Sequence, residues 1–213
     1  MDKEDGIFMK IMKQKIKLLC PQLIFLIVTF CIFMPSSLFL GNLDEFAVGF
    51  TALIPLLMAA SLITAAVVIL IGLIVPKKIC NIYAAVIFGG ALAAYVQGNF
   101  LNPDFGVLNG RQIQWSQFKV NGIISTVVWI VLIVVPAVIV CFKKDIMTNI
   151  IKWGSLFLSS IQVVTLVVLI VSSKRSVDYS YVVTKNDEFA LSSQGNVVVF
   201  IVDTLDNEDA QNY

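Results

Sequence analysis

The chain has 213 residues, of which 58% are hydrophobic and only 14% are charged, and its mean hydropathy is +0.90. Soluble domains have about 45–50% apolar and about 25% charged residues, so these values exclude a soluble globular enzyme for the chain as a whole. The formal net charge of +1 and the lack of histidine exclude two further classes, nucleic-acid binding proteins and enzymes built on histidine.

Five long stretches contain no Asp, Glu, Lys or Arg, and each has between 21 and 31 residues. A helix that spans a bilayer needs about 20 mostly apolar residues, whereas the helices of a soluble bundle carry a polar face. We therefore predict an all-α membrane protein with five transmembrane helices. The first stretch is too long for the apolar part of a signal peptide, so we expect it to be retained. The stretches are residues 18–43, 46–76, 79–103, 120–142 and 153–173.

The lysines and arginines between these stretches predict the orientation. Ten of them lie in residues 1–17 and in the second and fourth connections, whereas the first and third connections contain two. The positive-inside rule places the ten in the cytoplasm. We therefore predict a basic cytoplasmic N-terminus at 1–17, a membrane domain at 18–173 in the cell membrane, and an extracytoplasmic C-terminus. Lys174 and Arg175 are a small exception on the outer side.

Nothing within the spans indicates catalysis. No ionisable residue lies in the middle of a span, which argues against a charge-coupled transporter. In the third span, Gly89 and Ala93 lie four residues apart, as do Gly90 and Ala94, a spacing that predicts close helix packing or, alternatively, a ligand groove. We also expect helix kinks at three prolines, and we expect three amides either to lie near span ends or to form hydrogen bonds between helices. These residues are Pro35, Pro55, Pro136, Asn81, Gln97 and Gln162.

The third connection contains an outer loop at residues 99–119, which mixes aromatic rings with amides and carries turn signals at 102–104 and 109–110. Rings with polar partners suit the headgroup layer of a membrane. We predict that this loop lies on the membrane surface or against an outer domain.

The tail predicts the start of a second domain. Residues 174–195 are mixed and polar, as in a linker, and residues 197–202 are a continuous apolar run of β-branched and aromatic side chains. Such a run predicts a strand that is buried on both faces of a parallel sheet. Asp203 follows directly, at the strand end where α/β sheets bind ligands, and a carboxylate there suits a divalent cation. An ordinary turn is the alternative.

The five-span layout with an outer tail resembles the lipoteichoic acid synthase and phosphoglycerol transferase group, which are membrane-anchored members of the sulfatase and alkaline phosphatase superfamily. Residues 196–206, Asn-Val-Val-Val-Phe-Ile-Val-Asp-Thr-Leu-Asp, are similar to the first strand of the sulfatase-like domain. Residues 95–102 and 113–115 are similar to the outer loop of membrane-bound sulfatase-like proteins. The resemblance implies that Asp203 binds a divalent metal. The family's nucleophile and its other metal ligands have no match here, and Thr204 is not at the nucleophile position.

The resemblance implies the membrane-anchor region of a sulfatase-like, metal-dependent hydrolase or phosphoglycerol-type transferase that acts outside the cytoplasmic membrane. Residues 196–213 contain no second strand to pair with 197–202, so we expect a truncated α/β domain, no activity of this chain alone and no tight metal binding. The expected partners are the lipid bilayer, a lipid-linked substrate and a missing catalytic domain, but no nucleic acid. The alternative is a small self-sufficient polytopic membrane protein, or a partner subunit, with a disordered outer tail.

Overall fold

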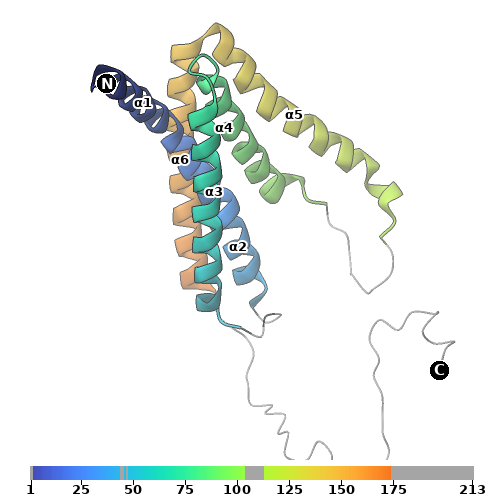
Figure 1. Ribbon diagram of the computed structural model, residues 1–213. Helices are drawn as coiled ribbons and strands as arrows, with labels where there is room; N and C mark the ends of the chain where they lie inside the picture. The colour runs from blue at the N-terminus through green and yellow to red at the C-terminus, as the bar shows by residue number, and fades with distance from the viewer. Residues whose placement is uncertain (1, 44–45, 47, 104–112, 174–213) are drawn as a thin grey trace, which may run out of the picture. The chain divides into compact units, whose positions relative to one another are not determined.

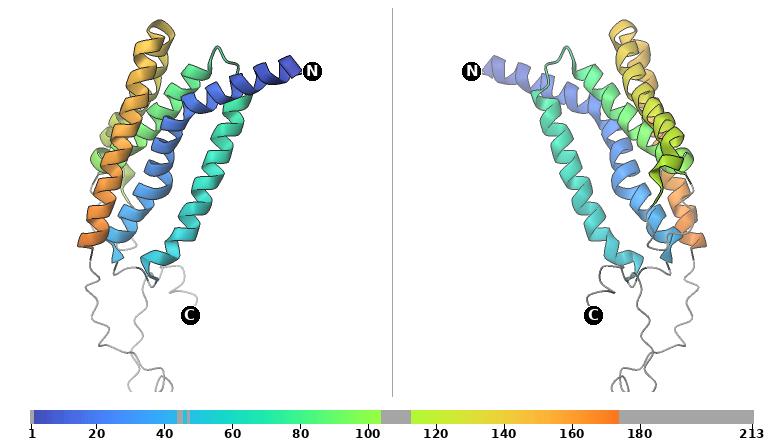
Figure 2. Two further views of the ribbon diagram at one scale, coloured as in Figure 1. Left: turned by 90° about the vertical axis from the view of Figure 1, so that its left-hand side faces the viewer. Right: turned by 90° about the vertical axis from the view of Figure 1, so that its right-hand side faces the viewer.

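The computed structural model describes residues 2–43, 46, 48–103 and 113–173, and these include no strand. Five helical spans within them are long and apolar enough to cross a membrane, which confirms the predicted number of spans and indicates a multi-pass membrane protein. They belong to one compact unit of the chain, and Figures 1 and 2 show how its helices run. The spans are Met9–Gly41, Phe50–Ile74, Cys80–Leu101, Trp115–Phe142 and Lys144–Ser172.

The first span is one continuous helix that changes from α-helix to π-helix and back to α-helix. It consists of α1 (Asp2–Leu26), the π-helical segment η1 (Ile27–Phe33) and α2 (Met34–Gly41). The π-helical turn lies just before Pro35, which has no N–H and would clash with the carbonyl four residues earlier in a regular α-helix. The Met34 N–H instead reaches back five residues to the Thr29 carbonyl.

The N-terminal part of the first span has two features that the sequence analysis did not predict. The helix already begins at Asp2, so residues 2–17 of the basic segment are helical and are continuous with the first span. Figure 2 shows that α1 changes direction along its length, and Pro21 lies inside it. Because kinks in helices are almost always found at prolines or a few similar features, we assign this bend to Pro21, which sequence analysis did not single out.

The other spans have simpler boundaries. A 3₁₀ turn, η3 (Phe50–Leu53), precedes α3 (Ile54–Ile74), and α4 (Cys80–Val96) continues as the π-helical segment η4 (Gln97–Leu101). A second 3₁₀ turn, η5 (Trp115–Phe118), leads into α5 (Lys119–Phe142), which α6 (Lys144–Ser172) follows.

The two prolines of these spans occupy different positions in their helices. Pro55 lies in the first turn of α3, where its missing N–H interrupts no helical hydrogen bond. The kink that the sequence predicted at Pro55 is therefore not required by this position. Pro136 lies inside α5 and is buried.

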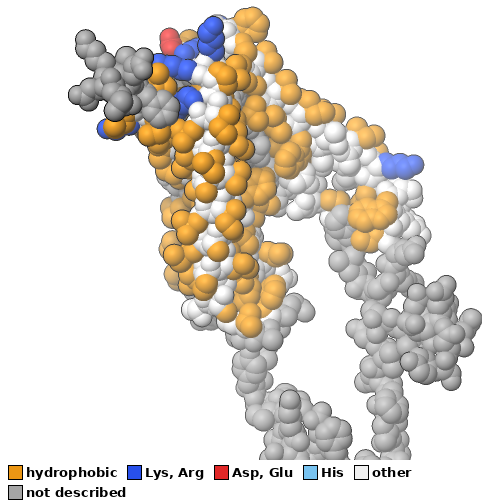
Figure 3. Space-filling view, viewed as in Figure 1, with side chains coloured by type: hydrophobic (Ala, Val, Ile, Leu, Met, Phe, Trp, Pro, Cys, Tyr) orange, Lys and Arg blue, Asp and Glu red, His pale blue; other side chains and the backbone are white. Residues whose placement is uncertain are grey.

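Helices α1 and α4 form the centre of the unit. Phe25 of α1 packs against Phe88 of α4 with ring centroids 5.8 Å apart, within a buried cluster that also includes Val140 of α5 and Ile151 of α6. The spans that contain α1 and α4 bury 44% of their most apolar window, whereas those that contain α3 and α5 bury 11%. The outer helices therefore present apolar side chains outward, and Figure 3 shows these side chains covering the visible face of the helices.

Gly89 allows α4 and α5 to approach each other at backbone distance. A Cβ atom at Gly89 would lie 2.4 Å from the Leu132 carbonyl oxygen and 2.8 Å from the Ile133 Cα of α5. A Cβ at Gly90 would meet nothing within 4 Å among the described residues. The predicted close packing is therefore confirmed at Gly89, but it is not formed at Gly90.

Lys15 ties α1 to the end of α3. Its Nζ donates hydrogen bonds to the carbonyl oxygens of Leu73 at 2.8 Å and Val75 at 2.6 Å. The last carbonyls of a helix have no partner within the helix, and a cation is favoured there. This lysine is thus engaged within the protein.

Candidate functional site

A polar pocket lies where both π-helical segments meet the last turns of α6. Its volume is about 590 Å³. Because α6 ends at Ser172, this pocket is at the end of the helical unit from which the tail continues. The lining residues are Phe33, Met34, Pro35, Ser37, Leu38, Asn42, Gly98, Asn99, Asn102, Thr165 and Leu169.

The two π-helical segments shape this pocket. Phe33 of η1 contacts Tyr95 of α4 with ring centroids 6.4 Å apart, which holds the first and third spans together. A Cβ at Gly98 of η4 would lie 3.3 Å from the terminal methyl of Met34, so glycine allows a tight approach here. Single π-helical turns occur frequently at functional sites because they redirect side chains out of the regular α-helical register.

Amide side chains form the polar wall. The Gln97 Nε2 donates to the Asn102 Oδ1 at 3.0 Å, and the Trp129 Nε1 of α5 donates to the Gln97 Oε1 at 3.2 Å. The amide nitrogens of Asn42 and Asn99 donate to carbonyl oxygens one turn earlier, at 2.8 and 2.7 Å. The predicted interhelical hydrogen bond of Gln97 is thereby confirmed.

Two neighbouring serines of α2 have hydroxyl groups without partners. The Oγ atoms of Ser36 and Ser37 are buried and make no hydrogen bond within the part of the chain that the structure describes. An unpaired buried polar group costs about 1–3 kcal/mol. Ser37 also lines the polar pocket.

Ser36 lines a second, apolar groove of about 490 Å³ between the first span, α3 and α6. Its α3 wall includes Met58 and Leu62, whose exposed fractions are 61% and 69%. In a bilayer such a groove is open to lipid chains. The remaining lining residues are Ile27, Ile32, Phe50, Ile54, Leu57, Ser61, Leu166 and Ile170.

A buried polar pair crosses the interior between η1 and α6. The Thr29 hydroxyl donates to the Gln162 Oε1 at 3.1 Å and accepts from the Gln162 Nε2 at 3.0 Å. Thr29 is fully buried and Gln162 is 1% exposed. The sequence predicted an interhelical bond of Gln162, which is confirmed, but nothing in the sequence pointed to Thr29 as its partner.

Asn81 is the third amide that the sequence predicted to bond between helices. Its Oδ1 accepts from the Thr148 hydroxyl of α6 at 3.5 Å, which is a long contact. All three predicted amides thus contact another helix.

The predicted metal site lies outside the described residues. Asp203, the strand at 197–202 and the linker at 174–195 all belong to residues 174–213, which the structure does not describe. Of the predicted outer loop at 99–119, residues 104–112 are likewise not described, and helical turns extend into it from both sides through η4 and η5.

The polar pocket is suited to binding by hydrogen bonds. The residues that line the polar pocket offer neutral amides and hydroxyls, with no ionisable side chain among them. Such groups bind a polar molecule by hydrogen bonds and orient it, but they supply neither a nucleophile activated by a base nor a set of metal ligands.

A scan against protein-family models, a search of curated proteins and a search of solved structures each found no match to this chain. The resemblance to sulfatase-like proteins therefore stays a prediction from the residues.

Proposed function

We propose that this chain is the membrane-anchor region of a sulfatase-like, divalent-metal-dependent hydrolase or phosphoglycerol-type transferase that acts outside the cell membrane. The observation that best supports the proposal is the order of its parts: five apolar spans, a polar linker, and an apolar run at 197–202 that ends in Asp203. In this proposal the run is the first strand of the catalytic sheet and Asp203 is a ligand of the metal.

The distribution of charge supports the orientation in this proposal. Figure 3 shows most of the blue side chains gathered at the end of the helices where α1 begins. This end contains the start of α1, the α3–α4 connection with Lys77 and Lys78, and the α5–α6 connection with Lys143 and Lys144. The positive-inside rule places this end in the cytoplasm. Because the number of spans is odd, the tail then lies on the outer side of the membrane.

The polar pocket supports a lipid-linked substrate. It lies at the tail end, which in this orientation is the outer surface of the membrane, and its lining includes a serine hydroxyl and three asparagine amides, which are groups suited to a headgroup. The anchor in this proposal retains the enzyme at the membrane and orients a lipid headgroup beneath the catalytic domain. Proximity of this kind contributes to catalysis by raising the effective concentration of the substrate.

The orientation is tested by reporter fusions after Lys78 and after Ser180. We expect a reporter that is active only outside the cytoplasm, such as alkaline phosphatase, to be active after Ser180 and silent after Lys78. A fluorescent protein that folds only in the cytoplasm should show the opposite pattern, because ten basic residues lie on the Lys78 side. The reversed pattern would contradict the orientation.

The catalytic part is tested by Asp203→Asn in the protein expressed from its own locus, with any coding sequence that follows codon 213 in frame. We expect membranes to cleave an aryl sulfate, an aryl phosphate or a labelled phosphatidylglycerol in the presence of a divalent metal. The variant should reduce turnover by about 100-fold or more, because a metal ion stabilises several kcal/mol of transition-state charge. The matched variant Asp206→Asn should keep the activity. Equal activity of both variants, or no metal-dependent turnover, would favour the self-sufficient membrane protein.

A further inference from the structure

A small cavity lies at the other end of the helical unit, between α1 and α6. Its volume is about 250 Å³, and its lining includes Gln14, Lys17 and Gln22 of α1 together with Thr148 and Lys152 of α6. Gln22 is fully buried, whereas Lys17 and Lys152 are exposed. Two lysines from different helices thus line one cavity at the level where the spans begin.

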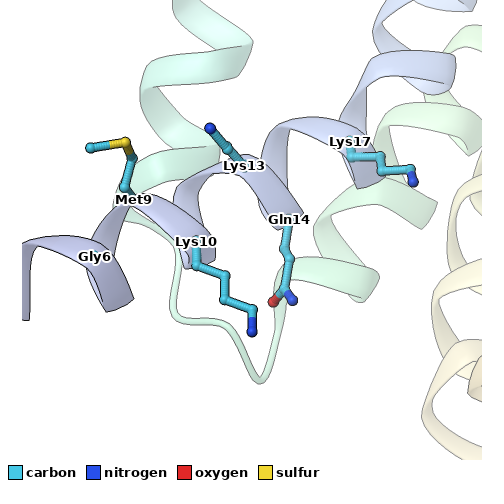
Figure 4. A pocket seen from close by; sticks show the side chains of 6 residues that line it. All are labelled: Gly6, Met9, Lys10, Lys13, Gln14 and Lys17. Atoms are coloured by element: carbon cyan, nitrogen blue, oxygen red, sulfur yellow. The ribbon is translucent and has the colours of Figure 1, made fainter. Parts of the chain in front are cut away.

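The cavity continues into a hollow along one face of α1. That hollow has a volume of about 380 Å³ and shares Gln14 and Lys17 with the cavity, while Lys10 and Lys13 extend it toward the N-terminus. In Figure 4, Lys10 and Gln14 extend to the same side of the helix. The face therefore presents cationic and amide donors in successive turns.

The side chains that the structure describes at this end carry an excess of positive charge. Asp145 is the only acidic residue whose side chain the structure describes. Lys15 is engaged by the carbonyl oxygens of Leu73 and Val75, whereas Lys17 and Lys152 line the cavity. The Lys152 Nζ lies 5.0 Å from the centroid of the Trp153 ring, and such aromatic rings favour the interface between lipid and water.

We propose that this cavity binds the phosphodiester headgroup of an anionic phospholipid in the leaflet that it faces. The Lys17 and Lys152 ammonium groups hold the phosphate from two sides, and the Gln14 amide donates a further hydrogen bond. Basic pockets between membrane helices bind anionic headgroups in this manner. A lipid fits better than free phosphate, because the lining includes the apolar side chains of Leu18 and Pro21 and the flanking helices are membrane spans. The proposal does not rest on the enzyme function above.

The test measures lipid retention by the full chain with native mass spectrometry. The protein is released from nanodiscs that contain equal mole fractions of phosphatidylglycerol and phosphatidylcholine. We expect the wild type to retain phosphatidylglycerol preferentially. Each of Lys17→Gln and Lys152→Gln should reduce this preference about fivefold, and the double variant about 25-fold, from the attraction that one basic residue near a membrane surface contributes.

The matched control is the double variant Lys77→Gln and Lys78→Gln, which removes the same charge at the same end but away from the cavity. It should keep the preference for phosphatidylglycerol. An equal loss of this preference in both double variants would overturn the proposed site, because it would show that the total positive charge of this end attracts the lipid. The charge-conserving pair Lys17→Arg and Lys152→Arg should retain the lipid even where the glutamine variants fold poorly, and loss of retention there would also overturn the proposal. Displacement of the lipid by millimolar inorganic phosphate would overturn the assignment to a lipid.

Discussion

Gly89→Ala is expected to lower the free energy of unfolding by about 1–3 kcal/mol, the cost of overpacking a close-packed interior. The added methyl group would lie 2.4 Å from the Leu132 carbonyl oxygen and 2.8 Å from the Ile133 Cα. Both atoms belong to the backbone of α5, so no side-chain rotation relieves the clash and the two helices must separate. Gly89→Leu should have a larger effect for the same reason. Unfolding in mixed micelles with increasing sodium dodecyl sulfate, followed by circular dichroism, provides the measurement.

The neighbouring Gly90→Ala is the matched control. Its added methyl group meets nothing within 4 Å among the described residues, and alanine favours a helix over glycine by about 1 kcal/mol. We expect this variant to be neutral or slightly more stable than the wild type. Equal destabilisation by both substitutions would show that α4 and α5 do not meet at backbone distance at Gly89.

The second large effect is expected at the buried pair of Thr29 and Gln162. Gln162→Leu leaves the Thr29 hydroxyl without its partner in a fully buried site. Thr29→Val likewise leaves the buried Gln162 amide without its hydrogen-bond partner. An unsatisfied buried group costs about 1–3 kcal/mol, so each single variant should lose stability in this range in the same unfolding experiment.

The double variant should be more stable than the sum of the single losses predicts, because it leaves no polar group unpaired. Coupling energies between polar side chains of membrane helices average about 0.6 kcal/mol and reach about 1.7 kcal/mol, and we expect this pair near the upper value. Ser160→Ala is the control on α6, since Ser160 is exposed and its hydroxyl donates to the Leu156 carbonyl of its own helix. Strictly additive losses at Thr29 and Gln162 would contradict a direct bond.

Sequence analysis predicted the number of spans correctly, because length and apolarity are properties of a single segment and need no knowledge of its neighbours. The helices begin earlier than the predicted apolar stretches in the first and the last span. The helices α1 and α6 extend into charged segments, since residues such as Lys15 and Lys152 remain helical while their long side chains reach the interface or a neighbouring helix.

By itself, then, the sequence determined five membrane-length helices, and it identified three amides that either lie near span ends or bond between helices. Only the tertiary structure decided that α1 and α4 are central, that Gly89 and not Gly90 meets α5, that Thr29 is the partner of Gln162, and that Lys17 and Lys152 border one cavity. The physical reason is that membrane helices are apolar on every face, so that no amphipathic pattern marks the buried side. Which faces meet depends on shape and on a few hydrogen bonds between residues far apart in the chain.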